Sequence, residues 1–174
     1  MATFVGRMVG AAKLNTATYE EIEQDASATR QAIGVVALSS VAAGIGLGAG
    51  VWGLVAGTLI ALLGWYVWAW LTHWIGTRLL PEPQTRSDRG ELLRTIGFAS
   101  APGILRVLGV IPALQAPVFA VTAIWTLVAV VVAVRQALDY QSTVRAIGVC
   151  VVGWLIQWVL FTVLALVAGI RPAA

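Results

Sequence analysis

Residues 51–77 read VWGLVAGTLIALLGWYVWAWLTHWIGT and contain no Asp, Glu, Lys or Arg. This segment is longer than the roughly 20 apolar residues that a helix needs to cross the hydrocarbon core of a bilayer. Its second half is rich in tryptophan and tyrosine, which gather at membrane–water interfaces. The stretch therefore predicts a transmembrane helix, and the rest of the chain is interpreted around it.

The composition of the whole chain also indicates a membrane protein. Of its 174 residues, 59% are hydrophobic and 11% are charged, whereas a soluble globular domain carries about 25% charged residues. The mean hydropathy is +0.88. A soluble enzyme and a disordered protein both need more charge than this. We expect an all-α, polytopic integral membrane protein.

Four more segments follow the pattern of the first. The predicted transmembrane helices cover residues 31–47, 51–77, 91–110, 116–134 and 146–170. The third should be broken at Pro102, which has no N–H to donate to the carbonyl of Phe98. The nearby Ser100 can satisfy part of the freed backbone. We thus predict a five-helix transmembrane domain over residues 31–170, followed by an external tail at 171–174.

The flanking cations predict the orientation of these helices. They lie before the first span, between the second and third, and between the fourth and fifth: Arg7, Lys13, Arg30, Arg78, Arg86, Arg89, Arg94, Arg135 and Arg145. The two alternate turns carry none. The positive-inside rule then places the N-terminus in the cytoplasm and the C-terminus outside. We expect a multi-pass protein of the inner (cytoplasmic) cell membrane.

Residues 1–30 are predicted to form a cytoplasmic amphipathic and acidic segment. Apolar side chains at helical spacing favour a short helix at the membrane surface, with a frayed terminus as the alternative: Phe4, Val5, Met8, Val9 and Leu14. Thr18 and Glu21 have the spacing of a capping box. This spacing predicts a helix that begins near Tyr19 and runs into the membrane.

Arg106 is the one charge expected inside the bilayer, and Gln157 is a polar residue at matching depth. Arg106 lies twelve residues past Arg94, and Gln157 twelve past Arg145. In regular helices both would sit ~18 Å deep and could meet. An intramembrane charge is a functional candidate; a snorkelling arginine or a structural residue in a wet, broken span is the alternative. Apart from Glu91, the first residue of the third span, no span contains Asp or Glu, which disfavours a transporter or channel, although the broken third span keeps that class open.

His73 is a candidate cofactor ligand. Ala69 lies four residues before it, and tryptophans surround it, as in the bacteriochlorophyll-ligating helix of light-harvesting antenna polypeptides. The alternative is an interfacial histidine in an aromatic belt. His73 and Cys150 are the only histidine and cysteine. No metal site is therefore expected.

Paired glycines are the candidates for helix packing. Gly46 with Gly50, and Gly53 with Gly57, each have the GxxxG spacing. This spacing allows helices to approach closely, so a dimer interface, packing within the chain and a flexible turn all stay open.

Other classes of function lack their sequence signals. The chain has no phosphate-binding loop, nucleophile elbow or HExxH motif, so we expect no enzyme. Its cations are spread thinly, so no nucleic-acid partner is expected.

Three segments, in this order, resemble the bacterial members of the Yip family of Ypt/Rab-interacting membrane proteins: YEEIEQD at 19–25, GFASAPG at 97–103, and VRQALDY at 134–140 leading to RAI at 145–147. The resemblance implies a five-span, non-enzymatic protein that associates with other membrane proteins, or with itself, or shapes the bilayer. The DLYGP signature of eukaryotic members is absent, which argues against GTPase binding. The alternative function is an accessory transmembrane subunit of a larger photosynthetic or respiratory complex, with a pigment or quinone near His73.

Overall fold

The computed structural model describes residues 3–167, and of residues 160, 161 and 163–167 it describes only the backbone. Every regular element in this part of the chain is a helix and none is a strand, so the all-α prediction is confirmed. Its elements are α1 (Phe4–Ala12), α2 (Thr16–Gln24), α3 (Ala28–Gly46), α4 (Val51–Trp74), the π-helical turn η1 (Ile75–Leu79), α5 (Arg89–Ala99), the 3₁₀ helix η2 (Ala101–Val110), α6 (Pro112–Ala137) and α7 (Thr143–Val167).

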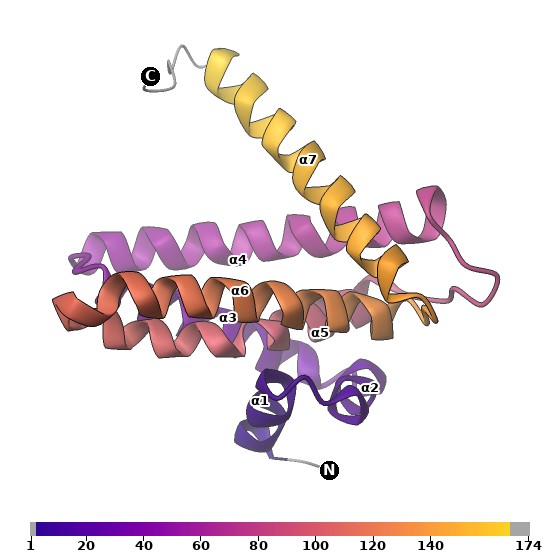
Figure 1. The fold of residues 1–174 in the computed structure, drawn as a ribbon, viewed down its shortest axis with the longest axis horizontal. Coiled ribbons are helices and arrows are strands. Elements are labelled where there is room, and N and C mark those ends of the chain that lie inside the picture. The colour runs from indigo at the N-terminus through magenta and orange to yellow at the C-terminus, as the bar shows by residue number, and fades with distance from the viewer. Residues whose placement is uncertain (1–2, 168–174) are drawn as a thin grey trace.

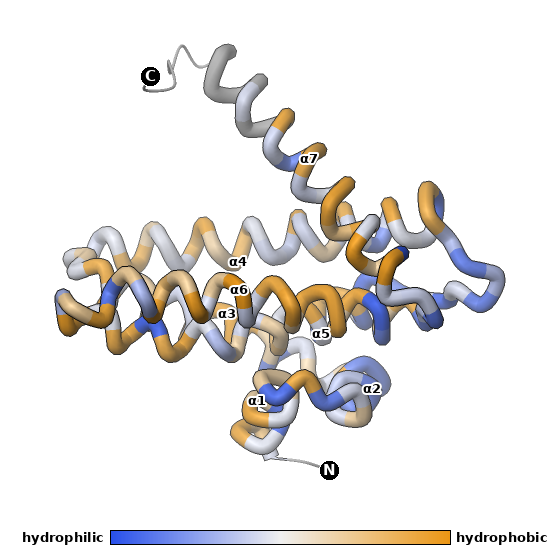
Figure 2. Tube along the Cα trace, viewed as in Figure 1, coloured by the Kyte–Doolittle hydropathy of each residue, from blue (hydrophilic) through white to orange (hydrophobic). Residues whose placement is uncertain are grey.

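Four helical segments form the bundle. Figure 1 shows α3, α4, α5 and α6 side by side, with α1 and α2 across one side and α7 leaving one end. Within the described residues, α3, α4 with η1, α5 with η2, and α6 are each long and apolar enough to cross a membrane. Hydrophilic residues gather at α2 and at the right-hand end in Figure 2. We call that end, formed by loops 80–88 and 138–142, the polar end, and the opposite one, at 47–50 and 111, the apolar end.

The N-terminal segment differs from the prediction of one continuous helix from Tyr19. The Asn15 side chain caps α2 by accepting from the Thr18 N–H at 3.2 Å, in place of the expected capping box. The helix then stops, because the Asp25 carboxylate accepts from the backbone N–H of Ser27 at 2.9 Å and from its hydroxyl at 2.6 Å. Such local bonds compete with helix propagation, so α3 begins anew at residue 28.

A buried arginine fastens α1 and α2 to the bundle. Arg7 is 2% exposed and pairs with Glu21 at 3.0 Å and with Asp25 at 2.7 Å. It also donates to Gln31 of α3 at 3.2 Å. On the α6 side, the Trp125 indole N–H donates to the Ala12 carbonyl, at the end of α1, at 2.7 Å. These bonds hold α1 across the bundle and not along it (Figure 1).

The third span changes helix type instead of kinking. The α-helix ends at Ala99, and a 3₁₀ helix continues to Val110. The break therefore comes at Ser100, two residues before Pro102. Pro102 sits in the first turn of the new helix, where its missing N–H costs least.

Small residues let α3 approach the end of α5 and the whole of η2 closely. A Cβ on Gly97 would lie 2.7 Å from the Cβ of Ala32, and one on Gly109 would lie 3.0 Å from the Gly46 carbonyl oxygen. Between these two positions, a Cβ on Gly103 would collide with the hydroxyl of Ser39. A 3₁₀ helix has three residues per turn, so residues 103, 106 and 109 share the face that packs on α3.

We predict that Gly46→Ala destabilises the fold, because a Cβ there would collide with the backbone carbonyl of Arg106. Overpacking of this kind costs roughly 1–3 kcal/mol. Gly57→Ala is the matched control: Gly57 lies inside α4, and a methyl group at this position would meet no neighbouring side chain or helix within 4 Å. The control change should therefore be neutral or stabilise by up to about 1 kcal/mol. Denaturant titration in detergent measures both. Equal stability of the two variants would contradict the close contact.

Candidate functional site

A cavity of about 380 Å³ lies among α4, α5, α6 and α7, near the middle of the bundle. The three polar residues predicted to lie inside the bilayer all line it: Ser100, Arg106 and Gln157. Its other walls are mostly apolar: Gly64, Trp65, Trp68, Ile96, Ala123, Thr126, Leu127, Val130 and Trp154. The structure thus brings together residues from both sides of the Ser100 break and from α7.

The charge of Arg106 has only neutral partners in the part of the chain that the structure describes. Its Nε donates to the Thr122 hydroxyl at 3.1 Å, and its guanidinium carbon lies 5.7 Å from the centroid of the Phe119 ring. Thr122 in turn donates to the Val118 carbonyl at 2.7 Å. The guanidinium is therefore oriented without being neutralised.

Arg106 points toward the middle of the bundle. Its backbone lies four residues before the end of η2, or ~8 Å from the apolar end at the 3₁₀ rise. Its partner Thr122 lies ten residues into α6, or ~15 Å from the same end. A snorkelling arginine would extend the other way, toward the nearer surface. Because η2 rises ~2.0 Å per residue in place of 1.5 Å, the Arg106 backbone lies further from Arg94 along the helix axis than in a regular α-helix.

Other residues add a buried hydroxyl group and an aromatic wall to the cavity. The Thr126 hydroxyl is buried and has no hydrogen-bond partner among the described residues. Trp68 and Trp154 stack at 6.0 Å between ring centroids with 21° between their planes. Trp65 lies in the same wall and donates its indole N–H to the Leu93 carbonyl at 3.1 Å. The cavity therefore offers a cation, hydroxyls and flat apolar rings to an occupant.

His73 and most of the predicted packing glycines lie elsewhere. His73 is in the last turn of α4, outside both this cavity and the polar cleft described below, and its Nδ1 is buried without a described partner; it stays a predicted cofactor ligand. Gly46 packs within the chain, Gly53 meets only Ala49 of the preceding turn, and Gly50 and Gly57 face open space.

A second cavity, which we call the polar cleft, lies at the polar end and measures about 290 Å³. It is lined by two segments that are far apart in sequence: Glu20, Glu23, Gln24, Arg135, Gln136, Asp139 and Tyr140. Gln136 bridges them by donating to Glu20 at 3.2 Å. Burial, then the nearby carboxylates of Glu91, Asp139 and Glu20, raise the pKa of Glu23 to about 7. The cleft therefore loses negative charge as pH falls through neutrality.

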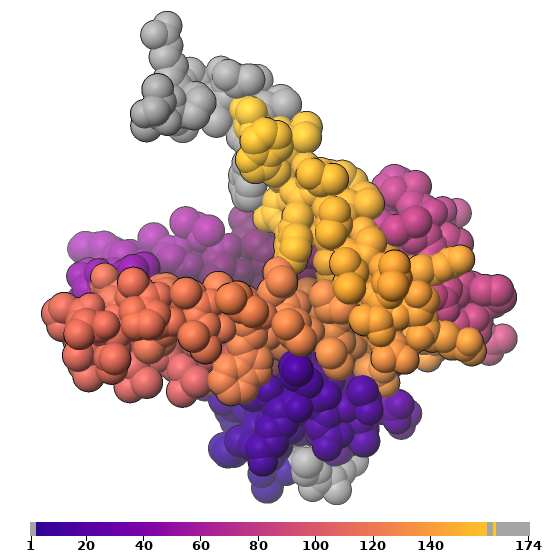
Figure 3. Space-filling model, in the orientation of Figure 1, coloured from indigo at the N-terminus to yellow at the C-terminus, as the bar shows by residue number. Residues whose placement is uncertain are grey.

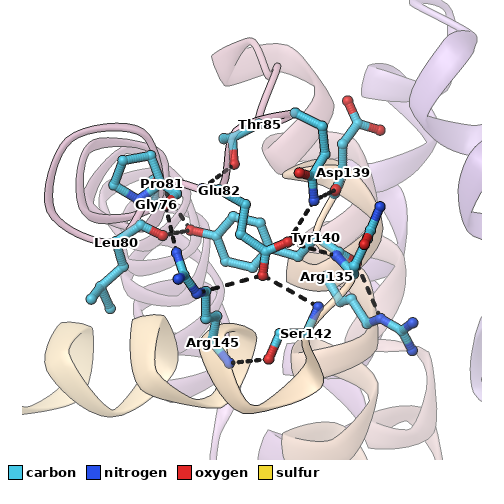
Figure 4. Close-up of polar contacts among 12 residues, drawn as sticks. Gly76, Leu80, Pro81, Glu82, Thr85, Arg135, Asp139, Tyr140, Ser142 and Arg145 are labelled. Carbon is cyan, nitrogen blue, oxygen red and sulfur yellow. Dashed lines mark hydrogen bonds and ion pairs between the residues drawn. The ribbon is translucent and has the colours of Figure 1, made fainter.

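Tyr140 joins the two loops of the polar end (Figure 4). Its hydroxyl lies 2.9 Å from the Gly76 carbonyl oxygen and 2.7 Å from that of Leu80. Burial raises its pKa to about 12, so it stays a donor. The hydroxyl thus satisfies carbonyls at the π-helical turn where α4 ends, and it ties that end to the loop before α7.

Glu82 completes this junction from the α4–α5 loop. Its carboxylate accepts from the backbone N–H groups of Gln141 at 2.9 Å and Ser142 at 3.3 Å. Arg145 lies 3.7 Å from the same carboxylate and donates to the Pro81 carbonyl at 2.6 Å. These backbone bonds lower the pKa of Glu82. The start of α7 is therefore fixed by a carboxylate from another loop.

The segments that meet here, 19–25 and 134–140, are two of those on which the family resemblance rests. A family model, the Yip1 domain, matches residues 15–169. The chain belongs to this family. Comparisons with curated proteins and with solved structures gave no match.

Sequence reasoning missed Glu82 and the role of Tyr140 in this Yip1 domain. Tyr140 ends a segment that the resemblance singled out, so it carried a signal. Glu82 lies between two prolines in a loop, and no local pattern pairs it with residues about sixty positions later.

We predict that Tyr140→Phe lowers stability by roughly 1–3 kcal/mol, because buried carbonyls at the end of α4 lose their donor. Tyr66→Phe is the matched control, since Tyr66 is 56% exposed, and it should change stability by less than about 0.5 kcal/mol. Thermal unfolding in detergent measures the difference. Similar melting temperatures for the two variants would show that the junction does not depend on this hydroxyl.

Proposed function

We propose that this Yip1-domain protein is a non-catalytic, five-span membrane protein that associates with other membrane proteins, including further copies of itself, through α7. The observation that carries the proposal is the departure of α7 from the bundle (Figure 3). Its 25-residue helix has the length and apolar character of a span. Its far half stands away from the chain's own helices.

The contacts of α7 with the bundle are confined to its first half. Ala146, Val149 and Cys150 are buried, and Gly153 packs against Trp68. Beyond Gly153, the apolar side chains that the structure describes are exposed. Because the bundle covers only one face of the first half, the rest of α7 must contact lipid or another protein.

The outward side of α7 carries one long apolar stripe. Val144, Val151, Leu155 and Trp158 are exposed by 77%, 43%, 58% and 69%. Their spacing of seven, four and three residues places them on one helix face. In a bilayer, such a face gains dispersion energy from close packing against a second helix. This stripe is the proposed contact surface.

The distribution of charge supports the proposed orientation in the inner (cytoplasmic) membrane. The cationic loops belong to the polar end, and the turns at the apolar end carry no charge. The positive-inside rule then sets the polar end and the N-terminus in the cytoplasm. Because the fifth span returns to the other side, the C-terminus lies outside; residues 168–174, including the predicted external tail, are outside the described part.

The placement of α1 supports a role in shaping the bilayer. It is a nine-residue helix with Val5 and Val9 exposed by 63% and 47%, and it lies across the bundle (Figure 1). A helix held crosswise in this way widens the protein at one depth of the bilayer only. The protein would thus displace lipid unevenly across the two leaflets.

We predict opposite results for two topology reporters. An enzyme that is active only outside the cytoplasm should be active when fused after Ala174, and silent when fused after a chain truncated within 82–90. The physical reason is the free energy of carrying the cationic loops across the membrane. The reverse pair of results would overturn the orientation.

We predict that a photo-crosslinking residue at Leu155 gives discrete crosslinked species in native membranes, including one at twice the mass of the chain if copies pair. The same residue at Leu59 of α4 is the matched control, because Leu59 is 63% exposed and Leu155 58%. Equal exposure without a partner should give only diffuse lipid adducts. Protein adducts from Leu59 alone, or from neither site, would refute association through α7.

A further inference from the structure

We propose that the cavity at Arg106 binds the anionic head group of a phospholipid that enters sideways from the bilayer. This inference does not depend on association through α7, because the α7 residues that line the cavity, Trp154 and Gln157, are not those of the proposed contact stripe. It rests on the uncompensated charge, the size and the opening of the cavity.

The unpaired positive charge of Arg106 favours the binding of an anion. Its described partners, Thr122 and Phe119, are neutral, and no described carboxylate pairs with it. A guanidinium that stays unpaired at this depth is unfavourable. Its planar fork binds phosphate oxygens in pairs, with bonds stronger than those between neutral groups. A phosphate group would therefore supply the counter-charge that the described residues do not provide.

The cavity also has the size and the additional donors for such a head group. Its volume of about 380 Å³ falls within the roughly 300–1,000 Å³ of ligand pockets. The buried Thr126 hydroxyl has no described partner, and Ser100 and Gln157 lie in the same wall. A phosphate at Arg106 would give these groups an acceptor. A lone water would leave most of the volume empty.

The opening favours a lipid over a water-soluble anion. Ala123, Leu127 and Trp154 line the cavity and are exposed, so its mouth opens on the sides of α6 and α7. Thr122, which accepts from the Arg106 guanidinium, lies ~15 Å from the apolar end, where the surroundings are hydrocarbon. A free phosphate has no apolar part to carry it there, whereas a phospholipid can leave its chains against Trp68 and Trp154 and place only its head inside.

The test uses the full chain in nanodiscs with dibromo-acyl lipids, whose bromines quench nearby tryptophans. At equal mole fraction, dibromo-phosphatidylglycerol should quench more than dibromo-phosphatidylcholine, because Trp68 and Trp154 line the cavity. Arg106→Gln should weaken the apparent affinity for phosphatidylglycerol roughly tenfold or more and abolish the preference. Arg86→Gln removes the same charge from an exposed loop position and should keep it.

A second pair of variants leaves the arginine in place. Ala123→Phe should block the mouth and remove the preference, whereas Ala120→Phe, also exposed on α6 but outside the cavity, should preserve it. If Arg106→Gln does not fold, this pair still tests the proposal. The proposal would be overturned if both lipids quenched equally in the wild-type protein. It would also be overturned if the controls Arg86→Gln and Ala120→Phe lost the preference for phosphatidylglycerol as fully as Arg106→Gln and Ala123→Phe. Binding of inorganic phosphate or of oleate, without binding of phosphatidylglycerol, would overturn the phospholipid as occupant. Crosslinking from Leu155 is scored separately, so the two proposals fail independently.

Discussion

The close approach of α3 and η2 is the contact on which the rest of the structure depends. Three small residues of α3, at positions 32, 39 and 46, meet three glycines at 97, 103 and 109. The first set repeats every seven residues and the second every six. The two spacings are similar because seven residues of α-helix rise ~10.5 Å, and six residues rise ~12 Å in the 3₁₀ helix that follows Gly97 and α5. A regular α-helix would turn these glycines to different faces.

This contact also determines where the charged side chain of Arg106 lies. With Gly103 and Gly109 facing α3, the backbone of Arg106 between them presses on Gly46. The long side chain then leaves along the bundle toward Thr122. The change of helix type at Ser100 thus has two effects. It places Pro102 where its missing N–H costs least, and it orients the Arg106 guanidinium toward the cavity beside α7.

Polar contacts near α2 and at the polar end hold together segments that the bilayer alone would leave free. Arg7 joins α1, α2 and α3, and Tyr140 with Glu82 joins the loops that precede α5 and α7. Both sites lie outside the apolar spans, where charges and backbone groups need partners but can also meet water. Because the junction at Tyr140 fixes only the start of α7, the helix is free to diverge from the bundle and expose its outer stripe.

The sequence by itself determined the class, the helical content, the position of four of the spans and the family, because apolar length and the order of three motifs are local properties of the chain. It placed the helix break within two residues, since a proline cannot donate a hydrogen bond. It did not determine the 3₁₀ form of the segment after Ser100, the direction of Arg106, or the packing of α1 against α2. Those depend on contacts made by Gly46 with Arg106, by Thr122 with Arg106 and by Arg7 with Asp25, which are 60, 16 and 18 residues apart. Only the tertiary structure decided them, because packing and ion pairing join helices that are distant in sequence, and the periodicity of one helix does not predict which partner its faces contact.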